Sequence, residues 1–164
     1  MTIIQAIERR ISCRTYRPVP LEPEKIERLA EALLANTTGP FGSRIRFALI
    51  RSERLGRTEL RPPGTYGVIK GARDFIAGAL PDTPRAMEDY GYCMEKNILA
   101  ATALGLGTCW LGGTFHRTGF AGRMNLAAGE LVPAVSPVGY ASGQRSLRER
   151  AMRFSAGSDR RKPW

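Results

Sequence analysis

The stretch from Pro84 to about Leu104 constrains the fold most, because it is the longest segment with helical periodicity and is apolar on most of its sides. A surface helix has one apolar stripe, whereas a helix that is apolar nearly all round is covered on several sides. We therefore expect a central helix with other elements packed around it. Gly105 and Gly107 are expected to end this helix, as glycines commonly do.

Shorter elements are expected on either side of this helix. The expected strands are apolar and rich in residues that favour β-structure, at residues 45–50, 74–80 and 131–140. The expected helices carry apolar residues at helical spacing, at residues 3–10, 23–34 and 121–126. Pro133 and Pro137 interrupt the last strand, so we expect it to be bent or to lie at an edge. Residues 143–164 read as a polar, basic tail.

Length and composition fit one domain, residues 1–164. Of the 164 residues, 43% are hydrophobic and 24% are charged, which is enough apolar material for one core. No apolar run reaches the roughly 20 residues needed to cross a bilayer, and the N-terminus lacks the pattern of a signal peptide. We expect a soluble, cytoplasmic protein with no membrane partner.

The positive charge of the chain is concentrated at its two ends. Residues 1–20 carry a net charge of +3 and residues 145–164 carry +5, out of +10 for the whole chain. Such an excess indicates an anionic partner, either nucleic acid, a membrane surface or a phosphorylated cofactor, with a solvated arginine-rich surface as the alternative. No known nucleic-acid-binding motif accompanies the charge, so we expect no nucleic-acid partner.

The cysteines and the histidine indicate neither a metal site nor a catalytic thiol. Cys13, Cys93 and Cys109 form no Cys-x-x-Cys pair, and His116 is the one histidine of the chain. This pattern argues against a disulfide framework, a zinc site or a nucleophilic cysteine, and favours buried thiols.

The acidic residues of the central helix are expected to be structural. Glu88 and Asp89 fit charges on the helix surface, whereas Glu95, on the buried face, fits a partner of an arginine. No Walker loop, zinc-protease, serine-hydrolase or paired-carboxylate signature is present. If the protein is an enzyme, a cofactor carries its reaction.

Two motifs indicate a ligand. In Arg10-x-Ser12-x-Arg14, an extended backbone would aim two guanidinium groups and a hydroxyl in one direction, which suits a phosphate, although a solvent-facing basic strand has the same pattern. The glycines of residues 105–113 follow a helix, so they do not form a dinucleotide fingerprint. The adjacent Gly112 and Gly113 suit close approach of the backbone to a flat ligand.

Taken in order, these segments resemble the FMN-dependent nitroreductase family, most closely the branch called "putative TM nitroreductase". The matching segments span almost the whole chain, at residues 10–16, 39–42, 65–72, 105–115, 133–140 and 161–164. The resemblance implies an α+β sandwich in which helices flank an antiparallel-dominated sheet and one long helix is central. It also implies a homodimer with FMN at the subunit interface.

The resemblance also implies roles for individual residues. Contacts to the phosphate and ribityl end of FMN would come from Arg10, Ser12, Arg14 and Arg161. Contacts to the flavin ring would come from Leu111, Gly112, Gly113 and Thr65, with a backbone N–H of Gly112 near N5. No side chain is assigned a catalytic role. The implied reaction passes hydride from NAD(P)H through the flavin to a nitroaromatic, a quinone or a similar small acceptor.

The sequence departs from the family pattern in two ways. A Ser-x-x-Asn-x-Gln-Pro-Trp type of segment that reaches the flavin in many members has no counterpart, and residues 39–42 occupy the comparable position. The chain also stops at Trp164, where members of this branch continue, so we expect a missing C-terminal portion. The missing Asn/Gln segment motivates an alternative function, a non-catalytic flavin- or nucleotide-binding member or a partner subunit.

Overall fold

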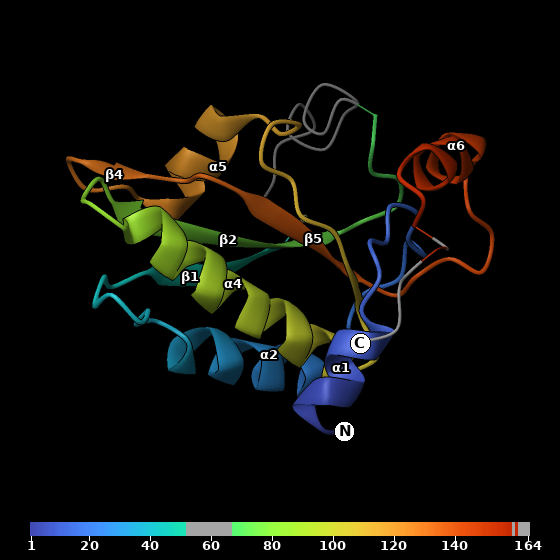
Figure 1. Ribbon diagram of the computed structural model, residues 1–164, viewed down its shortest axis with the longest axis horizontal. Coiled ribbons are helices and arrows are strands. Elements are labelled where there is room, and N and C mark those ends of the chain that lie inside the picture. The colour runs from blue at the N-terminus through green and yellow to red at the C-terminus, as the bar shows by residue number, and fades with distance from the viewer. Residues whose placement is uncertain (52–66, 159, 161–164) are drawn as a thin grey trace.

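The computed structural model describes residues 1–51, 67–158 and 160 (Figure 1). The helices of the described part are α1 (Ile3–Arg9), α2 (Pro23–Ala35), α4 (Ala86–Ala103), α5 (Arg117–Met124) and α6 (Leu147–Ser155). The strands of this part are β1 (Arg46–Arg51), β2 (Asp74–Pro81), β3 (Gly107–Thr108), β4 (Glu130–Leu131) and β5 (Val135–Gly139).

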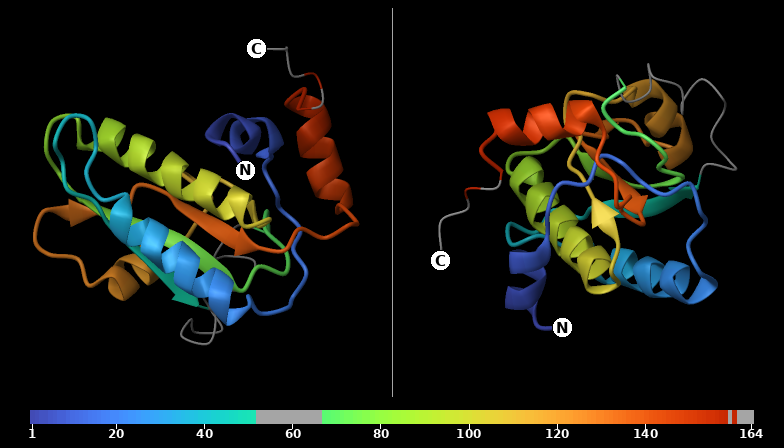
Figure 2. Two further views of the ribbon diagram at one scale, coloured as in Figure 1. Left: turned by 90° about the horizontal axis from the view of Figure 1, so that it is seen from below. Right: turned by 90° about the vertical axis from the view of Figure 1, so that its right-hand side faces the viewer.

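The strands form one antiparallel sheet between two layers of helices. The strand order is β1-β2-β5-β3, and β4 pairs with the C-terminal end of β2. Helices α2 and α4 cover one face, and α5 covers the other (Figures 1 and 2). This arrangement confirms the predicted α+β sandwich around an antiparallel sheet.

Strand β2 runs through the middle of the core. Its side chains alternate between the two faces, so Ile76 and Leu80 join the cluster under α2 and α4, while Phe75 and Ala77 join the cluster under α5. A strand covered on both faces is apolar throughout. This explains why residues 74–80 show an unbroken apolar run, and the predicted buried strand is confirmed.

The predicted central helix is α4. Half of its residues are buried, and they contact α1, α2, β2 and β3. Gly105 follows it with a φ of +75°, which confirms its role in ending the helix. The same prediction for Gly107 is wrong, because Gly107 lies in β3, where a Cβ would come within 2.8 Å of the Cβ of Cys13.

The strand predicted at residues 131–140 is broken into β4 and β5. Three residue steps separate Ala77 from Leu80 in β2, but four separate Leu131 from Val135 on the opposite side. The extra residue forms a β-bulge at the segment that contains Pro133, which has no N–H to donate. The bend is therefore confirmed. The edge position is wrong, because β5 is fully buried between β2 and β3.

Two helices differ from the prediction. Helix α5 begins at Arg117, four residues before the expected start at Ala121. Helix α6 forms within residues 143–164, for which the sequence analysis gave only a polar, basic tail. Its outward face carries Leu147 and Phe154, and its buried residues are Glu149 and Arg153. The apolar residues Leu147, Ala151 and Phe154 recur at helical spacing, but this face of α6 is exposed, so assigning the apolar face to the core would misplace the helix.

Asp89 is buried, contrary to the expectation of a surface charge. Its carboxylate accepts the backbone N–H groups of Phe41 (2.7 Å) and Ser43 (2.8 Å) and closes the loop before β1. Burial acts to raise the pKa of Asp89, but the hydrogen bonds from Phe41 and Ser43 outweigh it, so the pKa lies below its ordinary value. The charged form of Asp89 therefore stabilises the fold.

Replacing Asp89 with asparagine is expected to lower the thermal unfolding midpoint at neutral pH by roughly 3–10 °C. The asparagine has one acceptor oxygen, so the backbone N–H of Phe41 or of Ser43 would face its NH₂ group and lose its hydrogen bond. The lowered pKa means that the contribution of the carboxylate is complete above about 3.8, and is lost as pH falls through the folded value. The difference between Asp89→Asn and the unchanged protein should thus shrink below that pH. Glu88→Gln, at the exposed neighbouring position, is the control. A difference that stays constant with pH would contradict this account.

Candidate functional site

The segment that carries Arg10, Ser12 and Arg14 lies extended beside the sheet. Cys13 donates its backbone N–H to Thr108 of β3 (2.8 Å), and Lys70 donates its N–H to the carbonyl of Arg14 (2.9 Å). The segment therefore runs between β3 and the chain just before β2. Cys13 points into the protein and is 5% exposed, so the alternation of an extended chain turns Ser12 and Arg14 to the opposite side. The predicted extended conformation is confirmed.

The extended segment pairs with Thr108 of β3 through Ser12 and Cys13, so it also lies beside the next residue, Cys109, whose thiol is buried. Burial is the main cause that raises the pKa of Cys109, and the Glu149 carboxylate also raises it. Arg14, a hydrogen bond with Ser12 and Arg10 act to lower it. The fold thus places the segment of Arg10, Ser12 and Arg14 beside β3.

Glu95 of α4 connects Arg10 to the segment after β3. One of its carboxylate oxygens lies 3.2 Å from Nε of Arg10, and the other accepts the indole N–H of Trp110 (2.8 Å). This contact confirms the prediction that Glu95 pairs with an arginine. Because Glu95 sits on the longest helix of the described chain, it anchors the guanidinium of Arg10 near Trp110.

Arg14 has unused hydrogen-bonding capacity. Its Nε is buried and has no hydrogen-bond partner among the residues that the structure describes. A buried donor without a partner costs about 1–3 kcal/mol, so such a group is commonly completed by water or a ligand. The backbone N–H of Arg14 is directed elsewhere, toward the carboxylate of Glu149 (3.4 Å).

Glu149 is a site residue that the sequence analysis missed. It is 4% exposed, and it accepts the hydroxyl of Thr15 (2.6 Å), which fastens α6 onto the N-terminal segment. The available signal was the spacing Ser146-x-x-Glu149, which is typical of a capping box. Ser146 does cap α6 by accepting the N–H of Glu149 (3.2 Å), but the Glu149 side chain reaches Thr15.

The Gly112–Gly113 pair is exposed and follows Leu111, which pairs with Val135 at the start of β5. Neither residue has a positive φ, and no described atom lies within 4 Å of where a Cβ would stand on either one. The described chain therefore does not require glycine at these two positions. Leu111 is different, since its side chain is buried and its backbone pairs with Val135 in both directions (2.9 and 3.0 Å). Leu111 holds the start of the glycine pair in place.

None of the three thiols has the surroundings of a nucleophile. All are free and buried, and burial raises the pKa of each. For Cys13, burial and the Glu149 carboxylate raise the pKa to about 11. The predicted burial of the three thiols is thereby confirmed, and a raised pKa disfavours the thiolate form that a nucleophile needs. Among the described residues, no cluster of three His, Cys, Asp or Glu side chains could hold a metal ion.

Two predicted site residues, Thr65 and Arg161, lie outside the described residues. The remaining six are all described, at Arg10, Ser12, Arg14, Leu111, Gly112 and Gly113. Their roles toward a cofactor stay predictions. In the described part of the chain, no helix combines the length and apolar character needed to cross a membrane.

Solved structures with the same fold are nitroreductases. A nitroreductase family protein from Clostridium difficile 630 has 21% identity and a TM-score of 0.69, over 99% of this chain and 94% of that chain. A "putative nitroreductase in complex with FMN" from Desulfovibrio desulfuricans has 24% identity and a TM-score of 0.66, over 100% and 98%. A nitroreductase with bound FMN from Desulfitobacterium hafniense DCB-2 has 19% identity and a TM-score of 0.72, over 88% and 92%. At these identities the likeness establishes the fold.

The sequence itself matches one family over nearly its whole length. No curated protein matches the chain significantly. The family described as "Putative TM nitroreductase" matches residues 2–163. This protein therefore belongs to that branch of the nitroreductase family.

Proposed function

We propose that this protein is an FMN-dependent oxidoreductase that uses NAD(P)H to reduce a nitroaromatic, a quinone or a similar small acceptor. The observation that carries the proposal is that the segment of Arg10, Ser12 and Arg14 pairs with Thr108, four residues before the exposed Gly112–Gly113 backbone. Two solved nitroreductases with this fold hold FMN, which supports the same cofactor here. When bound, the flavin would supply the redox chemistry that the side chains of the described site lack.

The residues of the site fit an anionic, flat ligand. Arg10 and Arg14, with the Ser12 hydroxyl between them in sequence, provide charged and polar donors suited to a phosphate. The buried Nε of Arg14 is a donor that such a ligand could complete. The open space at Gly112 and Gly113 would let a ring lie against the backbone, whose N–H groups are donors.

The chain's own part in the reaction would be binding, orientation and electrostatics. Glu95 would hold the Arg10 side chain at the phosphate end. The positive side chains would stabilise negative charge on the bound ligand. By resemblance to the family, we propose a cytoplasmic homodimer with no nucleic-acid or membrane partner, and roles for Leu111, Thr65 and Arg161 as predicted from the sequence.

The visible absorption spectrum of the purified chain tests cofactor binding. After FMN is added and the sample is dialysed, a flavin band should remain. Oxidation of NADH and of NADPH should then be followed with and without a nitroaromatic acceptor. Steady turnover supports the oxidoreductase, whereas retained flavin without turnover favours the non-catalytic alternative. A chain that never retains FMN would contradict the proposal.

A further inference from the structure

The chain reverses direction directly after α6. Gly157 adopts a φ of +58° and donates its N–H to the carbonyl of Phe154 (3.1 Å), and Ser158 donates to the carbonyl of Arg153 (3.0 Å). These two bonds form a Schellman motif, in which a left-handed glycine turns the chain back across the end of the helix. Arg160 then donates its N–H to the carbonyl of Gly157 (2.9 Å), which closes a further turn.

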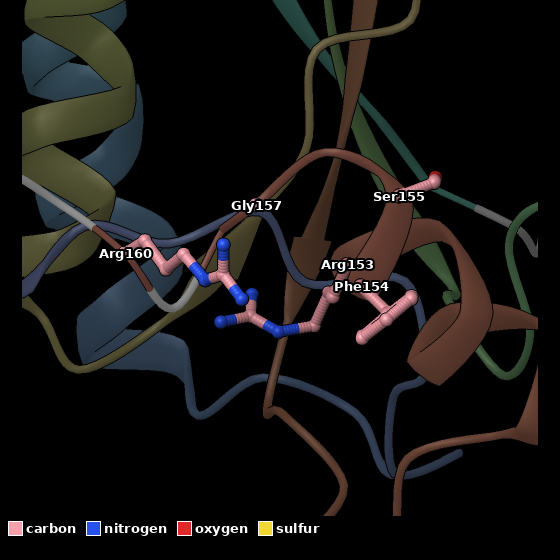
Figure 3. Close-up of a pocket in the computed structure, with 5 residues that line it drawn as sticks. All are labelled: Arg153, Phe154, Ser155, Gly157 and Arg160. Atoms are coloured by element: carbon pink, nitrogen blue, oxygen red, sulfur yellow. The ribbon is translucent and has the colours of Figure 1, made fainter.

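This reversal brings two arginines to the same cavity. Residues 153–155, Gly157 and Arg160 line a space of about 270 Å³, and the guanidinium groups of Arg153 and Arg160 point toward one another in it (Figure 3). Arg153 is 6% exposed, so packing restricts its position, whereas Arg160 is exposed. Two planar guanidinium groups facing one space are a common arrangement for binding a tetrahedral oxyanion.

The cavity borders the N-terminal part of the site. Arg153 and Glu149 are four residues apart on α6, so they lie on the same face of the helix, and both are buried. Glu149 contacts Arg14 and Thr15. The face of α6 that carries Arg153 is therefore the face that packs on the segment of Arg10, Ser12 and Arg14.

We propose that the Arg153–Arg160 cavity binds a phosphate group. The charge of this region supports an anion, since residues 145–164 carry a net +5. A phosphate monoester presents several acceptor oxygens, which two guanidinium forks can engage at once. Neither arginine belongs to the residues assigned to FMN above. The group could come from FMN itself, from another nucleotide or from free phosphate, so the proposal does not depend on the flavin assignment.

Titration of the full chain with inorganic phosphate, AMP, FMN and riboflavin tests this proposal. The test variant is Arg160→Gln, because Arg160 is exposed and its loss should leave the fold intact. Arg160→Lys keeps the positive charge but removes the planar set of guanidinium N–H donors. Arg150→Gln is the matched control, since Arg150 is an exposed arginine of α6 that does not line the cavity. Circular dichroism of each variant verifies folding.

Arg160→Gln should weaken phosphate and AMP binding by about tenfold or more, and Arg160→Lys by less, because a charged fork makes the stronger hydrogen bonds. Arg150→Gln should change the affinities by less than about twofold, as an exposed charge contributes little. If FMN binding weakens in Arg160→Gln while riboflavin binding does not, the phosphate is that of the flavin. If FMN binding is unchanged while phosphate and AMP binding weaken, the cavity takes a separate phosphate ligand.

Two results would overturn the proposal. One is an unchanged protein that binds none of the phosphate-bearing probes. The other is an equal effect of Arg160→Gln and Arg150→Gln, which would indicate general charge attraction. Failure of the flavin assignment would give a different result, because neither FMN nor riboflavin would bind. The titrations with inorganic phosphate and AMP would still measure binding at the Arg153–Arg160 cavity.

Discussion

Replacing Arg10 and Arg14 together with alanine is expected to weaken FMN binding by about a hundredfold or more. A charge-assisted hydrogen bond contributes on the order of 1.5–3 kcal/mol, and two such losses correspond to at least two orders of magnitude in Kd. The expectation rests on the position of both residues in the extended segment beside β3 and on the anchoring of Arg10 by Glu95. Quenching of flavin fluorescence on titration with the protein measures the Kd.

Riboflavin and a neighbouring arginine provide the controls for this double variant. Riboflavin lacks the phosphate, so its weaker binding should be the same in both proteins. Arg17→Ala removes an equal charge from the same segment, but Arg17 is exposed and lies over the ring of Tyr140. Arg17→Ala should therefore leave FMN binding within about twofold. Equal FMN affinity in the double variant and the unchanged protein would refute the assigned phosphate contacts.

Alanine at Gly71 is expected to destabilise the protein by about 2–4 kcal/mol, for two reasons that add. Gly71 has a φ of +76°, in the left-handed region that favours glycine, and a Cβ there would come within 2.3 Å of the carbonyl oxygen of Tyr16. That carbonyl cannot easily move, since Tyr16 donates its N–H to Lys70 (2.8 Å) and Arg17 donates to Tyr140 (2.9 Å). Denaturant unfolding measures the loss.

Gly129→Ala separates the two causes. Gly129 has a similar φ of +80°, but nothing lies within 4 Å of where its Cβ would stand. It should cost only the left-handed backbone penalty of about 1 kcal/mol. Since Tyr16 and Arg14 belong to one extended segment, Gly71→Ala should also weaken FMN binding, whereas Gly129→Ala should not. Equal destabilisation by the two substitutions would mean that the segment of Tyr16 adjusts freely.

The parts of the site that sequence could predict depend on local geometry. An extended chain alternates its side chains, so the spacing of Arg10, Ser12 and Arg14 already indicates a common direction. The helical spacing of Glu95 with Ile98 and Leu99 already indicates a partly covered carboxylate with an arginine partner, and the Glu95 side chain is 37% exposed. Both expectations needed only the periodicity of one element, and the structure confirms the extended segment and the pair.

The parts that sequence could not predict depend on distant segments. Asp89 looks like a surface charge until the loop before β1, more than forty residues away in the chain, supplies two N–H groups to it. Gly107 looks like the end of a helix until Cys13 packs against it. In each case the residue type fits two environments equally well, and the partner that decides between them lies far away in sequence.

By itself, the sequence determined the central helix and the buried strand β2, because hydrophobic periodicity reports which face of an element must avoid water. It also determined that Arg10, Ser12 and Arg14 share one side of the N-terminal segment, because an extended chain alternates its side chains. Only the tertiary structure decided where β5 and α6 lie. The two prolines of residues 131–140 suit an edge strand, yet a bulge and burial on both sides place β5 inside the sheet. Helix α6 buries Glu149 and Arg153, and such charges become favourable inside a protein only after the fold has brought their hydrogen-bond partners to them.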